Sequence, residues 1–223
     1  IMDNLLVDNE ELADYGIPIR GLIDRTGKGH SHQRFRSYRE TSTKLLKLHG
    51  SLNWLYCPRC REIDVTQRQK GAVRYIFERM DSHLSICPIC NVPYEPVIIT
   101  PTFLKSYDNT LIHQLWDSAE AALESANEVV FVGYSLPDAD IILRTMLTRA
   151  LATNRMREGS TDLDPQALPT RCRIILVDKV KLNDEESRKR ATETRKRYER
   201  LFGKIDDNDY FHGGLAEYIE KRC

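Results

Sequence analysis

Apolar residues divide the chain into an irregular first half and a regular second half. From residue 95 onward, short apolar runs alternate with segments whose apolar residues recur at helical spacing. The runs at 96–100, 129–132 and 173–177 are expected to be strands. Continuous apolar strands that alternate with helices are typical of a parallel sheet covered on both faces. The pattern therefore predicts an α/β fold.

Two helices are predicted between these strands, and a third follows them. The last one, at 183–202, is highly charged and is expected to pack through Tyr198, Leu201 and Phe202. Residues 155–171 are expected to be a loop. The apolar positions of the first two helices are Leu111, Ile112, Leu115, Trp116, Ala119, Ala122 and Leu123, then Ile141, Ile142, Leu143, Met146, Leu147, Ala150 and Leu151.

The first half is dominated by polar segments and by cysteines. Residues 24–43 are expected to be a surface loop, and a short apolar run at 45–48 then leads into His49 and Gly50. The stretch 57–90 holds two Cys-x-x-Cys pairs around a basic, amphipathic middle.

Composition narrows the class of protein. The 223 residues are 41% hydrophobic and 30% charged with zero formal net charge, so no global charge favours nucleic acid or anionic membrane. No apolar run approaches the roughly 18 residues of a spanning helix, and the first 30 residues lack a signal-peptide pattern. Six cysteines are too few for a disulfide scaffold. We expect a cytoplasmic protein that forms a homo-oligomer or has a protein partner, with no membrane or nucleic-acid partner.

The two Cys-x-x-Cys pairs predict a structural zinc site. Zinc prefers four soft ligands in a tetrahedron, and each pair supplies two thiolates from one tight turn. Four protein ligands leave no open position, so the metal is expected to hold shape and to do no chemistry. The segment between the pairs is expected to be a helical insertion. The ligands would be Cys57, Cys60, Cys87 and Cys90.

Two other interpretations of this segment remain open. The four cysteines could be unrelated reduced thiols or a redox pair. A zinc ribbon that grips nucleic acid is the second, because basic residues surround the pairs. These are Arg59, Arg61, Arg68, Lys70, Arg74 and Arg79.

Four short motifs follow one another along the chain: Leu48-His49-Gly50, the two cysteine pairs, Val130-Phe-Val-Gly133-Tyr-Ser135-Leu-Pro and Ile174-Ile-Leu-Val-Asp178. Their order resembles the sirtuin family, and most closely its bacterial sirtuin-like branch. The likeness covers roughly residues 1–180. It implies a partial doubly wound, Rossmann-like sheet formed by 1–54 and 91–223, with an inserted zinc module at 55–90.

The resemblance assigns roles to individual residues. His49 matches the family's catalytic histidine, which assists loss of nicotinamide from NAD, and imidazole titrates near working pH. Gly133 and Ser135 match the turn that touches the ribose and phosphates of NAD. Asp178 stands where the family usually has Asn near the adenosine ribose.

Each role has a structural alternative. His49 could be a structural histidine, Gly133 and Ser135 could belong to an ordinary strand-to-loop turn, and Asp178 could cap the following segment.

The sequence also departs from the family. It has no strand followed by a glycine-rich loop for the NAD pyrophosphate, since Gly27 and Gly29 lie in a polar stretch. Asp3 could be the Asp of the family's Asn-x-Asp arrangement, but Ile1 stands where the Asn belongs. We expect a fragment that lacks its N-terminal third and binds NAD weakly or not at all, the alternative being a degenerate relative that has lost cofactor binding.

A second departure bears on the reaction. The family's deacylases capture an acyl-lysine peptide as an added strand beside a Phe-Gly-Glu segment, where this chain has Pro101, which cannot donate to a sheet. This favours NAD hydrolysis, the activity common among sirtuin-like proteins of antiphage defence. Protein deacylation and a non-enzymatic, zinc-bearing interaction domain are the alternatives.

Overall fold

A computed structural model describes residues 15–17, 19–23, 30–31, 44–66, 86–98, 110–156 and 172–222. The chain divides into two compact units, 1–118 and 119–223, which we call the N-terminal and C-terminal units. In the part of the chain that is described, no helix is long and apolar enough to cross a membrane.

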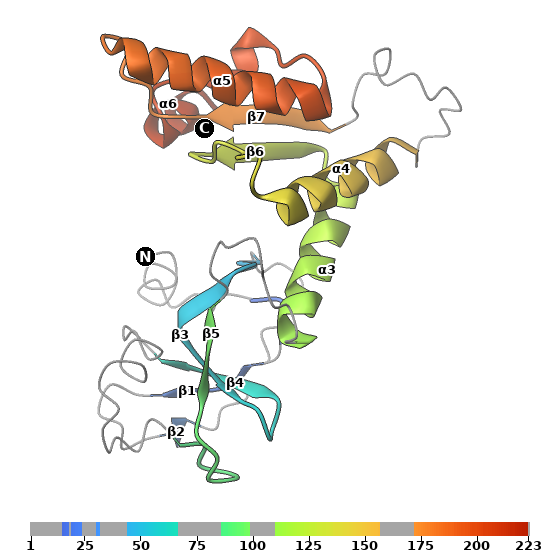
Figure 1. Cartoon of the computed structure of the whole chain (residues 1–223), viewed down its shortest axis with the longest axis vertical. Helices are drawn as coiled ribbons and strands as arrows, with labels where there is room; N and C mark the ends of the chain where they lie inside the picture. The colour runs from blue at the N-terminus through green and yellow to red at the C-terminus, as the bar shows by residue number, and fades with distance from the viewer. Residues whose placement is uncertain are drawn as a thin grey trace. The chain divides into compact units, whose positions relative to one another are not determined.

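The N-terminal unit is built on a five-stranded sheet in the order β2-β1-β4-β3-β5 (Figure 1). Strand β3 pairs antiparallel with β4 and β5, and β1 pairs parallel with β4 and antiparallel with β2. The strands are β1 (Ile19–Ile23), β2 (His30–Ser31), β3 (Gly50–Cys57), β4 (Glu62–Thr66) and β5 (Glu95–Ile98).

The run at 96–100 was expected to be a buried strand of the parallel sheet; its described part is a strand, but the predicted burial and the predicted sheet are wrong. Its described part forms β5, at the edge of the N-terminal sheet, and only Val97 within β5 is buried. Pro96 explains the edge position, because a residue without an N–H cannot serve a central strand on both sides.

The C-terminal unit contains a parallel sheet in the order β6-β7-β8. The predicted strands at 129–132 and 173–177 are confirmed as β6 and β7, while the short β8 was not predicted. The elements from residue 110 onward are α3 (Thr110–Ser125), β6 (Glu128–Val132), α4 (Ile141–Met156), β7 (Arg173–Val177), α5 (Glu185–Phe202), a 3-10 turn η2 (Asp207–Asp209), β8 (Tyr210–Phe211) and α6 (Leu215–Arg222).

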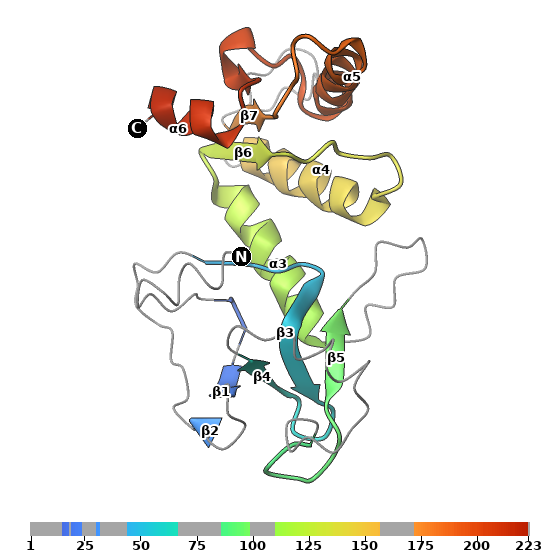
Figure 2. The same ribbon diagram turned by 90° about the vertical axis from the view of Figure 1, so that its left-hand side faces the viewer.

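Helices cover both faces of this sheet. Successive strand residues point to opposite faces. Phe131 contacts Tyr198 and Phe202 of α5, whereas its neighbour Val130 packs against the buried cluster on which Tyr218 of α6 also packs. Figure 2 shows α5 and α6 on opposite sides of β7. The predicted α/β class, with a parallel sheet between helices, is confirmed.

The helix predictions hold at most positions. In α3 the buried residues are Leu111, Ile112, Leu115 and Trp116, and in α4 they include Met146, Leu147, Ala150 and Leu151, as expected. Ile141 and Ile142, however, are exposed at the start of α4. The charged helix begins two residues later than expected, because Asp184 is its N-cap and accepts from the backbone N–H of Glu186.

Candidate functional site

The two cysteine pairs form nearly identical turns. In the first, the N–H of Arg61 donates to the carbonyl of Cys57 at 2.7 Å, and in the second the N–H of Asn91 donates to that of Cys87 at 2.9 Å. Arg61 and Asn91 have φ of 57° and 56°, so the residue that follows each turn has a left-handed backbone conformation. Each turn therefore aims two thiols to the same side.

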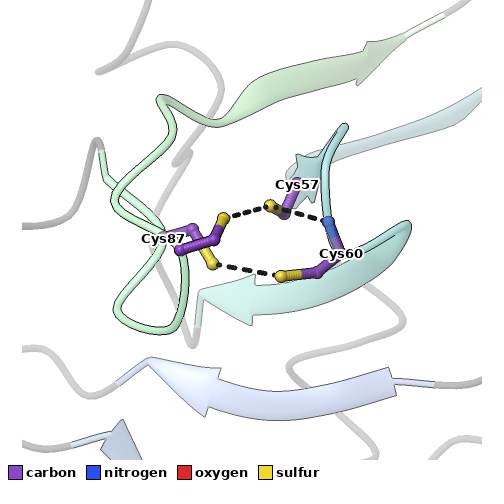
Figure 3. A group of neighbouring side chains, drawn as sticks. Cys57, Cys60 and Cys87 are labelled. Atoms are coloured by element: carbon purple, nitrogen blue, oxygen red, sulfur yellow. Dashed lines mark hydrogen bonds between the residues drawn. The ribbon is translucent and has the colours of Figure 1, made fainter.

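The turns bring four thiols together (Figure 3). Their sulfur atoms all lie within 4.8 Å of one another, with Cys57 Sγ 3.4 Å from Cys90 Sγ and Cys60 Sγ 3.8 Å from Cys87 Sγ. A tetrahedron with Zn–S bonds of about 2.3 Å has S–S edges of about 3.8 Å. The donor set and its spacing thus fit a tetrahedral zinc ion.

The cysteine cluster is closed to solvent on one side. Cys57 and Cys87 are fully buried and pack with Leu55 and Tyr94, while Cys60 and Cys90 are half-buried. Four sulfur ligands would leave a bound zinc no position for water or substrate. The arrangement fits a structural metal centre.

The thiols differ in their pKa values. Burial raises the pKa of Cys60 to about 12. Burial also raises the pKa of Cys87, but the N–H groups of Cys90 and Ile89 and the guanidinium of Arg20 lower it further, to about 6. Of these two cysteines, Cys87 is therefore the one whose surroundings favour the thiolate, the form that binds metal.

A buried polar cluster adjoins the cysteines, and sequence reasoning missed it. Arg20 on β1 donates through Nε to Asp64 Oδ1 at 3.0 Å and through Nη2 to Asp64 Oδ2, and it reaches Cys87 Sγ through Nη1 at 3.2 Å. The hydroxyl of Tyr94 accepts from Arg20 Nη2 at 2.7 Å and donates to Asp64. The one available signal was Asp64 itself, a carboxylate between the apolar Ile63 and Val65.

His49 lies in the turn that enters β3 in the N-terminal unit. The N–H of Gly50 donates to the carbonyl of Lys47 at 2.9 Å, and Gly50 has φ of 74°. A Cβ on Gly50 would lie 1.9 Å from the carbonyl oxygen of Val97, so only glycine fits. The half-buried imidazole meets the edge of Trp116, whose Nε1 donates to the carbonyl of Leu48 at 3.0 Å.

Gly133 and Asp178 lie together in the C-terminal unit. Val132 and Val177 are paired at the carboxyl ends of β6 and β7, and Gly133 and Asp178 are the next residues. The N–H of Gly133 donates to the carbonyl of Val177 at 2.8 Å, and its φ is 63°. Asp178 is half-buried and its Oδ2 accepts from the Tyr210 hydroxyl at 3.0 Å. The carboxyl edge of a parallel sheet is where doubly wound folds bind ligands.

Ser135 lies in the exposed turn that follows Gly133, and neighbouring helices brace this turn. From α5, Arg197 donates to the carbonyl of Ser135 at 3.2 Å and the Tyr198 hydroxyl donates to that of Tyr134 at 2.8 Å. From α4, Arg144 donates to the carbonyl of Leu136 at 3.3 Å. Burial raises the pKa of Tyr198, which keeps its hydroxyl a neutral donor. The hydrogen bond from Arg197 was not predicted, because the sequence indicated packing of 183–202 only through Tyr198, Leu201 and Phe202.

Other sequence predictions lie outside the described residues. These are Asp3, Gly27 and Gly29, Pro101, and most of the segment between the cysteine pairs. The described start of that segment is strand β4, where a helical insertion was expected. His49 belongs to the N-terminal unit, and Gly133, Ser135 and Asp178 belong to the C-terminal unit.

Comparisons with known proteins find structural similarity between this chain and two sirtuin structures. No family of known proteins matches the sequence, and no curated protein matches it. The structure of Sir2Tm bound to a propionylated peptide is 16% identical with a TM-score of 0.34, over 82% of this chain and 56% of that one. A structure on the basis of sirtuin substrate affinity is 17% identical with a TM-score of 0.33, over 73% of this chain and 59% of that one. The chain thus spans less than two thirds of either, and a likeness this distant carries no argument about its chemistry.

Proposed function

We propose that this chain belongs to a sirtuin-like enzyme that consumes NAD, and that its most favoured reaction is hydrolysis with release of nicotinamide. The observation that carries the proposal is the carboxyl edge of the parallel sheet. There the exposed backbone of Gly133 lies beside the carboxylate of Asp178, as a nucleotide ribose and phosphate require. The order of the sequence motifs, which resembles that of sirtuins, assigns His49 as the catalytic histidine.

In this proposal the C-terminal unit holds the nucleotide. Gly133 has nothing within 4 Å of the position of a Cβ, so ligand atoms can approach its backbone closely. The hydroxyl of Ser135 donates to or accepts from the cofactor, and Asp178 accepts from a ribose hydroxyl. Tyr210 orients that carboxylate through its hydrogen bond.

His49 acts as the base. The bond between C1′ of the ribose and the nicotinamide nitrogen breaks, and nicotinamide leaves as a neutral molecule. Water then adds to C1′ and its proton passes to the imidazole, since histidine side chains in general titrate near neutral pH. Asp3, which matches the family pattern in sequence, would be a further contact to NAD. The four cysteines would hold zinc as a structural element at 55–90.

Two alternatives remain. Protein deacylation would need an acyl-peptide to pair with a sheet edge, and β5 is such an edge, although Pro101 shortly after it weakens the site for peptide. A zinc-bearing interaction domain without enzymatic activity is the other.

The decisive experiment measures nicotinamide release from NAD by the full-length protein, with and without an acyl-lysine peptide. We expect turnover without peptide, and a loss of at least about 100-fold in the His49→Ala variant because a general base is removed. His113→Ala is the matched control, since His113 is exposed on α3 and should leave turnover unchanged.

The other outcomes decide between the alternatives. Turnover only when peptide is present would replace hydrolysis by deacylation. Absence of turnover in a folded, zinc-loaded protein would reject the enzymatic proposal and favour the interaction domain.

A further inference from the structure

The guanidinium of Arg20 joins the cysteine cluster to strands β1 and β4. Two of its nitrogens engage the carboxylate of Asp64 side by side, which fixes the plane of the group. The third nitrogen, Nη1, then points at Cys87 Sγ, 3.2 Å away. The side chain of Arg20 is 9% exposed and that of Asp64 is 3% exposed, so the arrangement is sheltered from water.

Charge explains why such a group belongs beside the cysteines. Four thiolates around one Zn²⁺ carry a net charge of about −2, and two of the four sulfurs here are fully buried. A buried charge is costly unless a charged hydrogen-bond donor meets it. The guanidinium is the side-chain donor that reaches a cysteine sulfur among the described residues.

The neighbours of Arg20 hold it in the orientation that this role needs. Arginine is always charged in proteins, so the contacts of Arg20 to Asp64 and Cys87 are made by a cationic donor. The phenol of Tyr94 contacts both members of the Arg20–Asp64 pair. That phenol accepts from Arg20 and donates to Asp64, so it fastens the pair from one side.

We propose that Arg20 is an outer-sphere partner of the four-cysteine metal centre, and that Asp64 and Tyr94 are positioning residues which aim it at Cys87. Arg20 offsets part of the charge of the loaded centre and strengthens its hold on the metal. The proposal rests on the metal binding inferred above. Strands β1 and β4 carry no cysteine ligand. Through Arg20 and Asp64 they nevertheless contribute directly to the metal affinity.

The test compares metal binding by the full chain and its variants. First, the zinc content of the unmodified protein is measured, and then its zinc affinity is measured by competition with a chromophoric chelator. Loss of an outer-sphere partner typically weakens metal affinity about 10–100-fold. We expect a loss of this size in Arg20→Met and a smaller loss in Tyr94→Phe. In Arg20→Lys the zinc affinity should be intermediate, because lysine keeps the charge but lacks the planar, paired N–H donors of the guanidinium.

A spectroscopic readout separates this role from a purely structural one. In the Co²⁺-loaded protein, a donor at Cys87 Sγ stabilises the sulfur electrons and raises the energy of the sulfur-to-cobalt charge-transfer band. Arg20→Met should therefore shift that band to longer wavelength. The double variant Arg20→Met/Asp64→Asn should show the same shift, and it avoids leaving the carboxylate of Asp64 buried and unpaired if the single variant fails to fold.

Arg173→Met is the matched control. It also breaks an Arg–Asp pair, with Asp209, but it lies in the C-terminal unit and should leave zinc affinity and the cobalt band unchanged. A protein that takes up no zinc or cobalt would overturn the metal centre itself. Normal metal content with unchanged affinity and an unshifted band in the Arg20 variants would overturn only the role of Arg20.

Discussion

The five-stranded sheet of the N-terminal unit and the three-stranded sheet of the C-terminal unit differ in what fills their cores. Around β7 the buried residues are mostly aliphatic and aromatic and two helices cover them, although Asp209 is buried beside Arg173. Around the cysteine turns Leu55 is buried together with two thiols, a carboxylate and a phenol, and a guanidinium lies almost as deep. An apolar core stabilises by area removed from water, whereas a polar one depends on every partner being present. The N-terminal unit should therefore be the more fragile to single losses.

Removing a metal ligand should expose this difference most strongly. In Cys87→Ser we expect loss of zinc and unfolding of the N-terminal sheet, because metal binding to structural sites contributes about 10–16 kcal/mol in zinc-finger peptides. Both tryptophans, Trp54 and Trp116, belong to the N-terminal unit, so their fluorescence reports its unfolding alone. Hydrogen exchange of β7 reports the C-terminal unit, which should stay protected.

Cys172→Ser is the control for that experiment. Cys172 is also buried, but it lies in the C-terminal unit and is no member of the cysteine cluster. Zinc content should be unchanged in this variant. Native fluorescence in metal-free Cys87→Ser would contradict the prediction.

Two glycines with similar backbone angles give the second comparison. Gly50→Ala should destabilise the N-terminal unit by more than about 4 kcal/mol, since a Cβ would meet the carbonyl oxygen of Val97 at 1.9 Å. Gly133→Ala should cost the C-terminal unit only about 1–2 kcal/mol, from its positive φ in open space. Denaturant titrations followed by fluorescence and by hydrogen exchange measure the two values. Equal losses would contradict the close approach of β5 to Gly50.

The smallest expected effect tests the polar contact that braces the Gly133 turn. Tyr198→Phe removes the hydroxyl that donates to the carbonyl of Tyr134 and leaves the ring in place, which should cost about 1–2 kcal/mol. Tyr218→Phe keeps the ring that packs on Phe211 and should cost less. Hydrogen exchange of β6 and β7 is the measurement. An equal, negligible effect of both would show that the turn needs no bracing.

Much of the parallel sheet could be predicted because its signals are local. The run at 129–132 is apolar throughout and the run at 173–177 is apolar after Arg173, which is a composition typical of strands in a helix-covered parallel sheet. Strand β8 has two residues, Tyr210 and Phe211, too few to show any period. It exists because β7 offers a parallel edge to pair with. Strand β5 was assigned to the wrong sheet because a short apolar run does not reveal its partner.

The sequence by itself determined that the two cysteines of each pair lie together, since two residues between them leave only a tight turn that aims both thiols one way. It also determined the two main strands of the parallel sheet. Only the tertiary structure decided that Arg20, Asp64 and Tyr94 meet beside Cys87, because they come from separate segments. The same is true of Gly133 and Asp178, which the parallel register of β6 and β7 places side by side. Contacts between distant segments depend on strand pairing, and no spacing along the chain encodes it.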